Sequence, residues 1–145
     1  GENVRNNPHE LLEVRDQLGE RVVEFGFLPR DDYLRLLNKA DVVISAAKHE
    51  FFGISVVEAL AAGAIPGLPN HQSYPEIIPE PWHTSALYTP GELVDRLRDV
   101  LLNLDTWSST TEGLAQEMQK YDWSVMIDTY DSLIESVINE YGHNL

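Results

Sequence analysis

The chain has 145 residues, with ten Lys plus Arg against 24 Asp plus Glu, a formal net charge of −14, 43% apolar residues and no cysteine. This composition is typical of a soluble globular domain, and it excludes a disulfide framework and thiolate chemistry. So acidic a surface repels nucleic-acid backbone and anionic lipid, which makes this segment by itself a poor candidate for either partner. No apolar run approaches the roughly 20 residues of a membrane span, and we expect a cytoplasmic protein.

The first part of the chain predicts two helices around a short strand. Apolar residues at helical spacing up to Leu18, stopped by Gly19, predict a helix that begins near Pro8. The apolar run 22–25 predicts a strand. The loop after it contains an Asp that is expected to cap a helix over residues 33–39.

The central part repeats the order of strand, loop and helix. The β-branched run 42–44 predicts a strand buried on both faces, and a loop around Gly53 leads into a helix over 54–62. A strand over 64–68, a helical turn near 74–78, a strand over 85–88 and a helix to about Leu104 are expected to follow. Such alternation predicts an α/β fold, with a Rossmann-like parallel sheet flanked by helices.

The last part of the chain predicts helices alone. Trp107 is expected to open a helix that reaches about Lys120, and the run 121–124 to cap a long helix over 125–140. Because no linker or low-complexity tract interrupts the chain, we expect residues 1–145 to form a single domain.

The strand ends indicate where a ligand binds. In open parallel sheets ligands bind beyond the carboxyl ends of the strands, and the loops 26–31, 45–53, 69–76 and 88–91 all follow predicted strands. At this rim Glu50 and Glu58 flank Gly53, where a helix N-terminus offers free N–H groups to an anion such as a phosphate. The pattern indicates a ligand that carries both phosphate and hydroxyl groups.

The same residues also have structural interpretations. Glu58 is compatible with a solvated helix position, Glu50 with a carboxylate that caps the helix, and Glu76 with bonding to the backbone of its own loop. Phe51 and Phe52 are expected to be packing residues.

The histidines give no metal signal. His49 and His71 lack metal-ligand spacing, and the sequence contains no Asp-x-Asp pair for a nucleotide-bound divalent ion, so we expect no metal. His83 is expected at the surface.

The combination of these motifs resembles a known family. The spacing Glu50-x7-Glu58 around Gly53, followed by the run 58–63 and by Pro75-Glu76-Ile77, is similar to the donor-binding core of retaining, GT-B-fold glycosyltransferases of the "glycosyl transferases group 1" family. The run 121–130 resembles the closing helix pair of that family. The resemblance implies the C-terminal, donor-binding half of such an enzyme, inactive alone. The N-terminal acceptor domain and the first strand–helix–strand unit are then expected to be absent.

A narrower resemblance concerns the substrates. Within the family, the runs 40–53 and 74–79 are similar to the mannosyltransferases that act on queuosine in tRNA. This similarity implies a hexosyltransferase with GDP-mannose as donor and tRNA as acceptor, which the absent domain would bind. No cofactor besides the donor substrate is implied.

The resemblance assigns roles around the loop. Glu50, the catalytic candidate, would accept hydrogen bonds from hydroxyls of the donor sugar. The peptide N–H groups of Phe52, Gly53 and Ile54 would hold the diphosphate, because glycine lets the backbone come close. Catalysis would come mainly from placing the donor and stabilising the leaving diphosphate, without a protein nucleophile.

Three further acidic residues complete the implied donor site. Glu58 would bind the ribose hydroxyls as a bidentate acceptor. Asp31 would pair with guanine N–H groups, and Glu76 would serve mainly to hold its loop.

The sequence departs from the family in two respects. The run 71–74 stands where the family commonly has paired glycines, which puts a backbone contact to the sugar in question. The family's Arg and Lys that neutralise the diphosphate lie in the absent upstream unit. Without that unit the sheet would expose an edge, so we expect self-association with a second copy.

Two other functions remain open at this point. A nucleotide-sugar 2-epimerase of similar two-domain build would bind the same donor without any acceptor. A non-catalytic acidic interaction module would need neither Glu50 nor Glu58.

Overall fold

The structure is a computed structural model that describes residues 9–141. The chain divides into two compact units, Gly1–Leu36 and Leu37–Leu145. The expected start of the first helix at Pro8 lies outside the described residues.

The first unit is helical where it is regular. It contains α1 (His9–Leu18), the 3-10 helix η1 (Gly19–Arg21) and α2 (Arg30–Leu37). The end of α1 at Leu18 is as predicted, and Gly19 follows it with φ +55°. The helix α2 begins three residues before the predicted start, so Asp31 and Asp32 occupy its first turn.

The predicted strand over 22–25 is wrong. These residues form no strand, and Val23 is 77% exposed. A strand is stabilised by a hydrogen-bonded neighbour, and the described residues of this unit contain no second strand. Instead, the ring of Phe25 lies 5.3 Å from the guanidinium carbon of Arg15 on α1.

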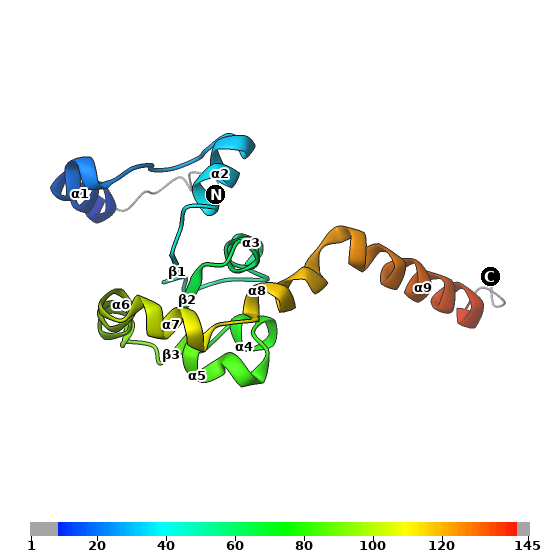
Figure 1. The fold of residues 1–145 in the computed structure, drawn as a ribbon. Coiled ribbons are helices and arrows are strands. Elements are labelled where there is room, and N and C mark those ends of the chain that lie inside the picture. Colours follow the sequence, from blue (N-terminus) through cyan, green and yellow to red (C-terminus); the bar gives the residue numbers. More distant parts are fainter. Residues whose placement is uncertain (1–8, 142–145) are drawn as a thin grey trace. The chain divides into compact units, whose positions relative to one another are not determined.

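The second unit contains the sheet (Figure 1). Strands β1 (Val42–Ile44), β2 (Ile65–Pro69) and β3 (Leu87–Tyr88) are parallel and lie in the order β1-β2-β3. The register pairs Val42 with Ile65 and Leu68 with Leu87. The chain therefore has the predicted α/β, Rossmann-like parallel sheet, and all three strands end at one edge.

The central strand carries two prolines, which a sheet interior normally excludes because they lack an N–H donor. In β2 the odd residues face β1, since Ile65 donates to the Asp41 carbonyl and Gly67 accepts from the Ser45 amide. Pro66 therefore faces β3, which pairs only with residues 68 and 69. Pro69 faces β1 just beyond its last ladder bond. Neither proline lies where a strand partner needs a donor.

The unit also contains helical segments, several of which cover the sheet. They are α3 (Ile54–Ala61), α4 (Tyr74–Ile77), η2 (Glu80–Trp82), α5 (His83–Ala86), α6 (Leu93–Leu102), α7 (Leu104–Thr110), α8 (Leu114–Glu117), η3 (Met118–Tyr121) and α9 (Trp123–Tyr141). The helix α3 contacts α8 and η3, and α6 contacts β2.

Two predicted elements differ from the structure. The helix predicted over 107–120 is broken into α7, α8 and η3, because Gly113 adopts φ +85° between them. A Cβ there would also lie 3.5 Å from the Trp82 ring. The strand predicted over 85–88 is shortened, because Ser85 and Ala86 belong to α5.

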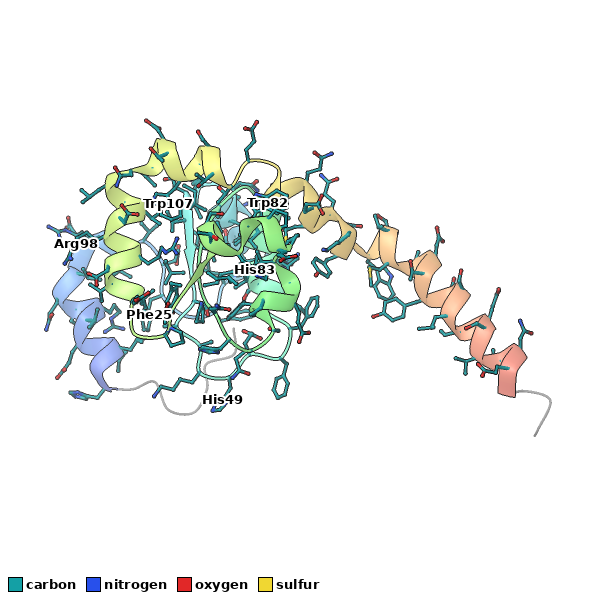
Figure 2. All side chains as sticks on the ribbon, turned by 90° about the horizontal axis from the view of Figure 1, so that it is seen from below. Phe25, His49, Trp82, His83, Arg98 and Trp107 are labelled. Carbon is teal, nitrogen blue, oxygen red and sulfur yellow. The ribbon has the colours of Figure 1, made fainter. Side chains whose placement is uncertain are left out.

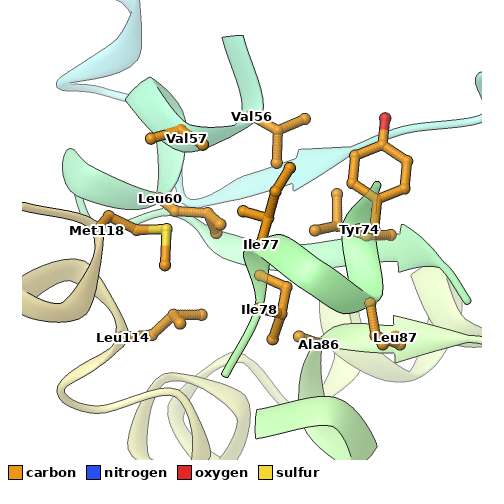
Figure 3. Packing of buried hydrophobic residues seen from close by; sticks show 11 residues of the cluster. Val56, Val57, Leu60, Tyr74, Ile77, Ile78, Ala86, Leu87, Leu114 and Met118 are labelled. Carbon is orange, nitrogen blue, oxygen red and sulfur yellow. The ribbon is translucent and has the colours of Figure 1, made fainter. Parts of the chain in front are cut away.

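The core lies between α3, α4, the sheet and the α8–η3 segment. In Figure 3, Leu114 and Met118 lie beside Leu60 of α3, with Ile77 and Ile78 next to them. All five side chains are at most 2% exposed. Apolar contact across these elements is what holds α3, and with it the loop before α3, against the sheet.

The long helix α9 matches the prediction. Its N-terminus is capped by Asp122, and hydrogen bonds from the Ser124 hydroxyl and amide lower the pKa of this carboxyl. The apolar side chains of α9 are largely exposed, for example Trp123 at 67% and Leu133 at 58%. No described helix is long and apolar enough to cross a membrane.

The core gives a direct test of this packing. Leu60→Ala should lower the free energy of unfolding by about 2–5 kcal/mol, because it leaves a cavity in a site with 1% exposure. Leu102→Ala, at a position that is 76% exposed, should change it by less than about 0.5 kcal/mol. Urea denaturation measures both values, and equal losses would contradict the assigned core.

Candidate functional site

The loops after the three strands form one rim, as predicted for 45–53, 69–76 and 88–91. Residue Ser45 follows β1, Asn70 follows β2 and Thr89 follows β3. The backbone bonds Ser45 N–H to Gly67 carbonyl (3.1 Å) and Asn70 N–H to Tyr88 carbonyl (2.8 Å) tie these strand ends together. The fourth predicted loop, 26–31, belongs to the first unit.

Glu50 lies in the loop after β1 and binds the backbone in front of α3. Its Oε1 accepts hydrogen bonds from the amides of Phe51 (3.1 Å) and Gly53 (3.0 Å). Gly53 has φ +78° and is the residue before the first turn of α3. The carboxylate thus occupies the position at the helix N-terminus that favours an anion, and the capping interpretation of Glu50 describes this geometry.

Two neighbouring amides are not used by the loop itself. Among the described residues, the N–H groups of Phe52 and Ile54 have no hydrogen-bond acceptor. Phe52 packs edge-on against Tyr121 with ring centroids 5.4 Å apart, as expected of a packing residue. The expectation for Phe51 is wrong: its side chain is 99% exposed, because the loop turns it outward.

The ring of Tyr74 lies against Gly53. A Cβ on Gly53 would lie 3.4 Å from the Tyr74 ring and 3.5 Å from Cγ of Glu50. The positive φ therefore favours glycine at position 53, whereas a Cβ there would be in ordinary van der Waals contact with both side chains.

Tyr74 and Tyr88 form a hydrogen-bond network with Ser45 that sequence reasoning missed. The Tyr74 and Ser45 hydroxyls are 2.7 Å apart, and the Tyr88 hydroxyl donates to the Ser45 carbonyl at 2.8 Å. Burial raises the pKa of both tyrosines; the Ser45 hydrogen bond opposes this at Tyr74, whereas Coulomb repulsion from Glu50 adds to it. The network joins the end of β1 to α4 and β3.

The other three predicted acidic residues lie on helices rather than in the loop around Gly53. Glu58 lies half-buried on α3, one turn and a half after Gly53. Glu76 is exposed on α4, and its carboxylate has no hydrogen bond to the described chain, so the expected bond to its own loop is absent there. Asp31 is exposed on α2 in the first unit.

The loop after β2 is strained where the family commonly has glycines. Gln72 adopts φ +59°, and its side chain donates to the Lys48 carbonyl at 3.2 Å, which links this loop to the Glu50 loop. Within the described chain, His71 Nδ1 and Ser73 Oγ are buried without a hydrogen-bond partner. Positive φ and unpaired polar atoms both cost free energy, and such features are concentrated at functional sites.

His83 is not the surface residue that was predicted. It is half-buried, and its Nε2 lies 2.8 Å from the Ile78 carbonyl and 3.1 Å from the Pro75 carbonyl. The ring therefore fixes both ends of α4, which carries Tyr74 and Glu76. Among residues 9–141, no three His, Cys, Asp or Glu side chains converge on one point.

A parallel α/β sheet flanked by helices, with a glycine-centred loop at the carboxyl ends of its strands, belongs to the class of open α/β domains that bind ligands at this edge. The chain belongs to the family "Glycosyl transferases group 1", whose model matches residues 5–117. It is also 44% identical over 80 residues to the tRNA-queuosine alpha-mannosyltransferase of Drosophila melanogaster. That match covers 55% of this chain and 21% of the length of the fly protein.

The capping role of Glu50 can be measured. Glu50→Ala should lower the free energy of unfolding by about 1 kcal/mol, because the Gly53 amide loses its acceptor at a helix N-terminus. Glu76→Ala removes the same charge from an exposed site and should cost less than about 0.5 kcal/mol. Chemical denaturation of the two variants tests the difference, and equal stability would rule out the cap.

The raised pKa of Tyr74 predicts that the folded chain loses stability at alkaline pH. Because the pKa of Tyr74 is raised in the folded chain, the unfolded chain releases this proton first, and stability falls as pH rises above about 10. Tyr74→Phe should be less stable at neutral pH by about 1 kcal/mol, and the deficit should shrink above pH 10. Denaturation curves between pH 8 and about 11 measure this, with exposed Tyr130→Phe as the control for loss of a phenol. A deficit that stays constant with pH would contradict it.

Proposed function

We propose that this chain is the nucleotide-sugar-binding part of a glycosyltransferase that moves mannose from GDP-mannose, with retention, to queuosine in tRNA. The observation that carries the proposal is the loop 50–54, where free backbone amides and a carboxylate meet at the N-terminus of α3. The similarity to a tRNA-queuosine alpha-mannosyltransferase supports the choice of sugar and acceptor. Such an acceptor is consistent with a cytoplasmic protein.

The diphosphate is proposed to bind at the amides of Phe52, Gly53 and Ile54. Those of Phe52 and Ile54 are without an acceptor among residues 9–141, and the Gly53 amide is held by Glu50. An arriving phosphate competes with Glu50 for that amide, because both are anions that the helix dipole attracts. The displaced carboxylate then turns to the hydroxyls of the donor sugar, which is the catalytic role proposed for Glu50.

The nucleoside is proposed to bind through carboxylates. Glu58, further along α3, accepts two hydrogen bonds from the ribose hydroxyls, and Asp31 accepts from guanine N–H groups. Glu76, on α4, is proposed as a further donor-binding residue. No metal and no cofactor besides the donor are needed in this scheme.

The transfer breaks the bond between the anomeric carbon and the diphosphate oxygen, and it forms a bond from that carbon to an acceptor hydroxyl on the same face. The acceptor proton goes to the leaving diphosphate. The chain contributes by holding the donor and by hydrogen bonds to the charge that develops on the leaving group. The acceptor and further cationic groups are proposed to come from outside this chain.

Calorimetric titration with GDP, UDP and ADP tests the proposal. GDP should bind more tightly than the other two, and Glu58→Ala should weaken it at least about tenfold, because a charged acceptor of two hydrogen bonds is lost. Glu135→Ala, on the exposed surface of α9, removes the same charge and should leave the affinity unchanged. Equal binding of the three nucleotides would count against GDP-mannose. Unchanged affinity in Glu58→Ala would exclude the ribose role.

A further inference from the structure

A pocket lies at the opposite edge of the sheet from Glu50. It has a volume of about 540 Å³ and is bordered by η2, α5, α6 and α7. The helix α6 begins beyond the carboxyl end of β3 and packs along β2, so its last turn lies where the strands begin. The lining residues are Pro81, Thr84, Ser85, Asp99, Asn103, Thr106, Trp107 and Thr110.

The aromatic wall of this pocket is fixed in place. Trp107, which Figure 2 labels on α7, lies under the guanidinium of Arg96, with 4.6 Å from Cζ to the ring centroid. Its indole N–H donates to Asp99 Oδ2 at 3.1 Å. Arg96 itself donates to the carbonyls of Thr84, Ser85 and Leu87. The indole is thus held on one face and along one edge before any ligand arrives, which lowers the entropic cost of binding.

Several neutral polar groups around the pocket have no partner. Asn103 uses its Nδ2 for the carboxylate and the carbonyl of Asp99, so its Oδ1 is available. The hydroxyls of Thr84 and Thr106 make no hydrogen bond to any residue that the structure describes. A hydroxyl can donate or accept, and Asp99 adds an acceptor with remaining lone pairs.

These features together select the ligand chemistry. Asp99 is the one charged lining residue, and it repels phosphates and carboxylates in a chain of net charge −14. A lone carboxylate is also too few ligands for a divalent cation. With anions and divalent ions disfavoured, the hydroxyl and amide groups beside the indole fit a neutral ligand with many hydroxyls and an apolar ring face, and the volume falls within the roughly 300–1,000 Å³ of small-molecule sites.

We propose that this pocket binds a pyranose unit of a carbohydrate. The sugar ring lies against Trp107, and its hydroxyls donate to Asp99 and to Asn103 Oδ1 and exchange hydrogen bonds with the hydroxyl of Thr106. The site is separate from the donor loop and does not depend on the function proposed above. It would hold a glycan while the donor is bound elsewhere.

The test uses the indole N–H signal of Trp107 in a ¹⁵N–¹H NMR spectrum, assigned with Trp107→Phe. Methyl α-mannopyranoside should shift this signal in a saturable way. Sorbitol, which has the hydroxyls without a pyranose ring, should not. Asp99→Asn should weaken binding about tenfold, because it removes a charged acceptor. Asp95→Asn removes the same charge from the exposed side of α6, where it pairs with Arg98, and should bind as the parent does.

A second variant guards against misfolding of Asp99→Asn, since that side chain also holds Trp107. Thr106→Ala removes one hydroxyl from the pocket without touching this network, and it should weaken binding about threefold to fivefold. No shift with the mannoside, or an equal shift with sorbitol, overturns the proposal. Unchanged binding in Thr106→Ala together with Asp99→Asn overturns it as well. Unaltered mannoside binding in Glu58→Ala would support a site independent of the donor loop.

Discussion

The rim of the sheet depends on the hydrogen bond between the buried Tyr74 hydroxyl and Ser45. Tyr74 is fully buried, and its ring lies against Gly53, so the loop after β1 rests on the first residue of α4. Tyr88 extends the same network from β3. Removing a partner here leaves a buried hydroxyl unpaired, which costs more than the bond itself contributes. The position of Gly53 relative to the sheet is therefore determined by contacts between residues far apart in the sequence, and not by the loop sequence alone.

The contact between Tyr74 and Gly53 explains how one short loop can hold both the Glu50 carboxylate and unpaired backbone amides. Glu50 binds the Gly53 amide, so the unliganded loop satisfies a donor that would otherwise be exposed at a helix N-terminus. The adjoining amides of Phe52 and Ile54 have no acceptor in the described part of the chain. An anion that replaces the carboxylate therefore gains several amides and releases a side chain at the same time. In the proposed function, the position of the Glu50 side chain depends on ligand binding, because Glu50 and the diphosphate compete for the Gly53 amide.

The sequence predicted the elements whose signals are local. The β-branched run gives β1 at residues 42–44, and Gly53 and Gly63 bracket α3 within one residue of the prediction. The elements that differ depend on tertiary context: residues 22–25 have no neighbouring strand within their unit, and α5 takes residues from the predicted third strand. No local pattern in the sequence predicts that the chain adopts a left-handed conformation at Gly113.

In the candidate site, too, some residues could be predicted from the sequence and others could not. Glu50 and Gly53 could be chosen from sequence because they are three residues apart and act on one helix N-terminus. The Ser45 network could not, since its hydroxyl pair spans 29 residues and the Tyr88 bond spans 43. Asp31 was chosen through the family resemblance alone, and it lies in the first unit, whereas Glu50 and Glu58 lie in the second.

Electrostatics then limits what the loop can do by itself. Backbone amides are dipoles without net charge, so they stabilise a diphosphate while the net charge of −14 repels it. In the loops 45–53, 69–76 and 88–91 the single Lys or Arg is Lys48, two residues before Glu50. The backbone carbonyl of Lys48 already accepts a hydrogen bond from the Gln72 side chain, which links Lys48 to the loop after β2. One exposed cation cannot offset a diphosphate in so acidic a chain. Under the proposed function, tight donor binding requires positive charge from outside these loops, and the loop itself contributes position and direction rather than most of the affinity.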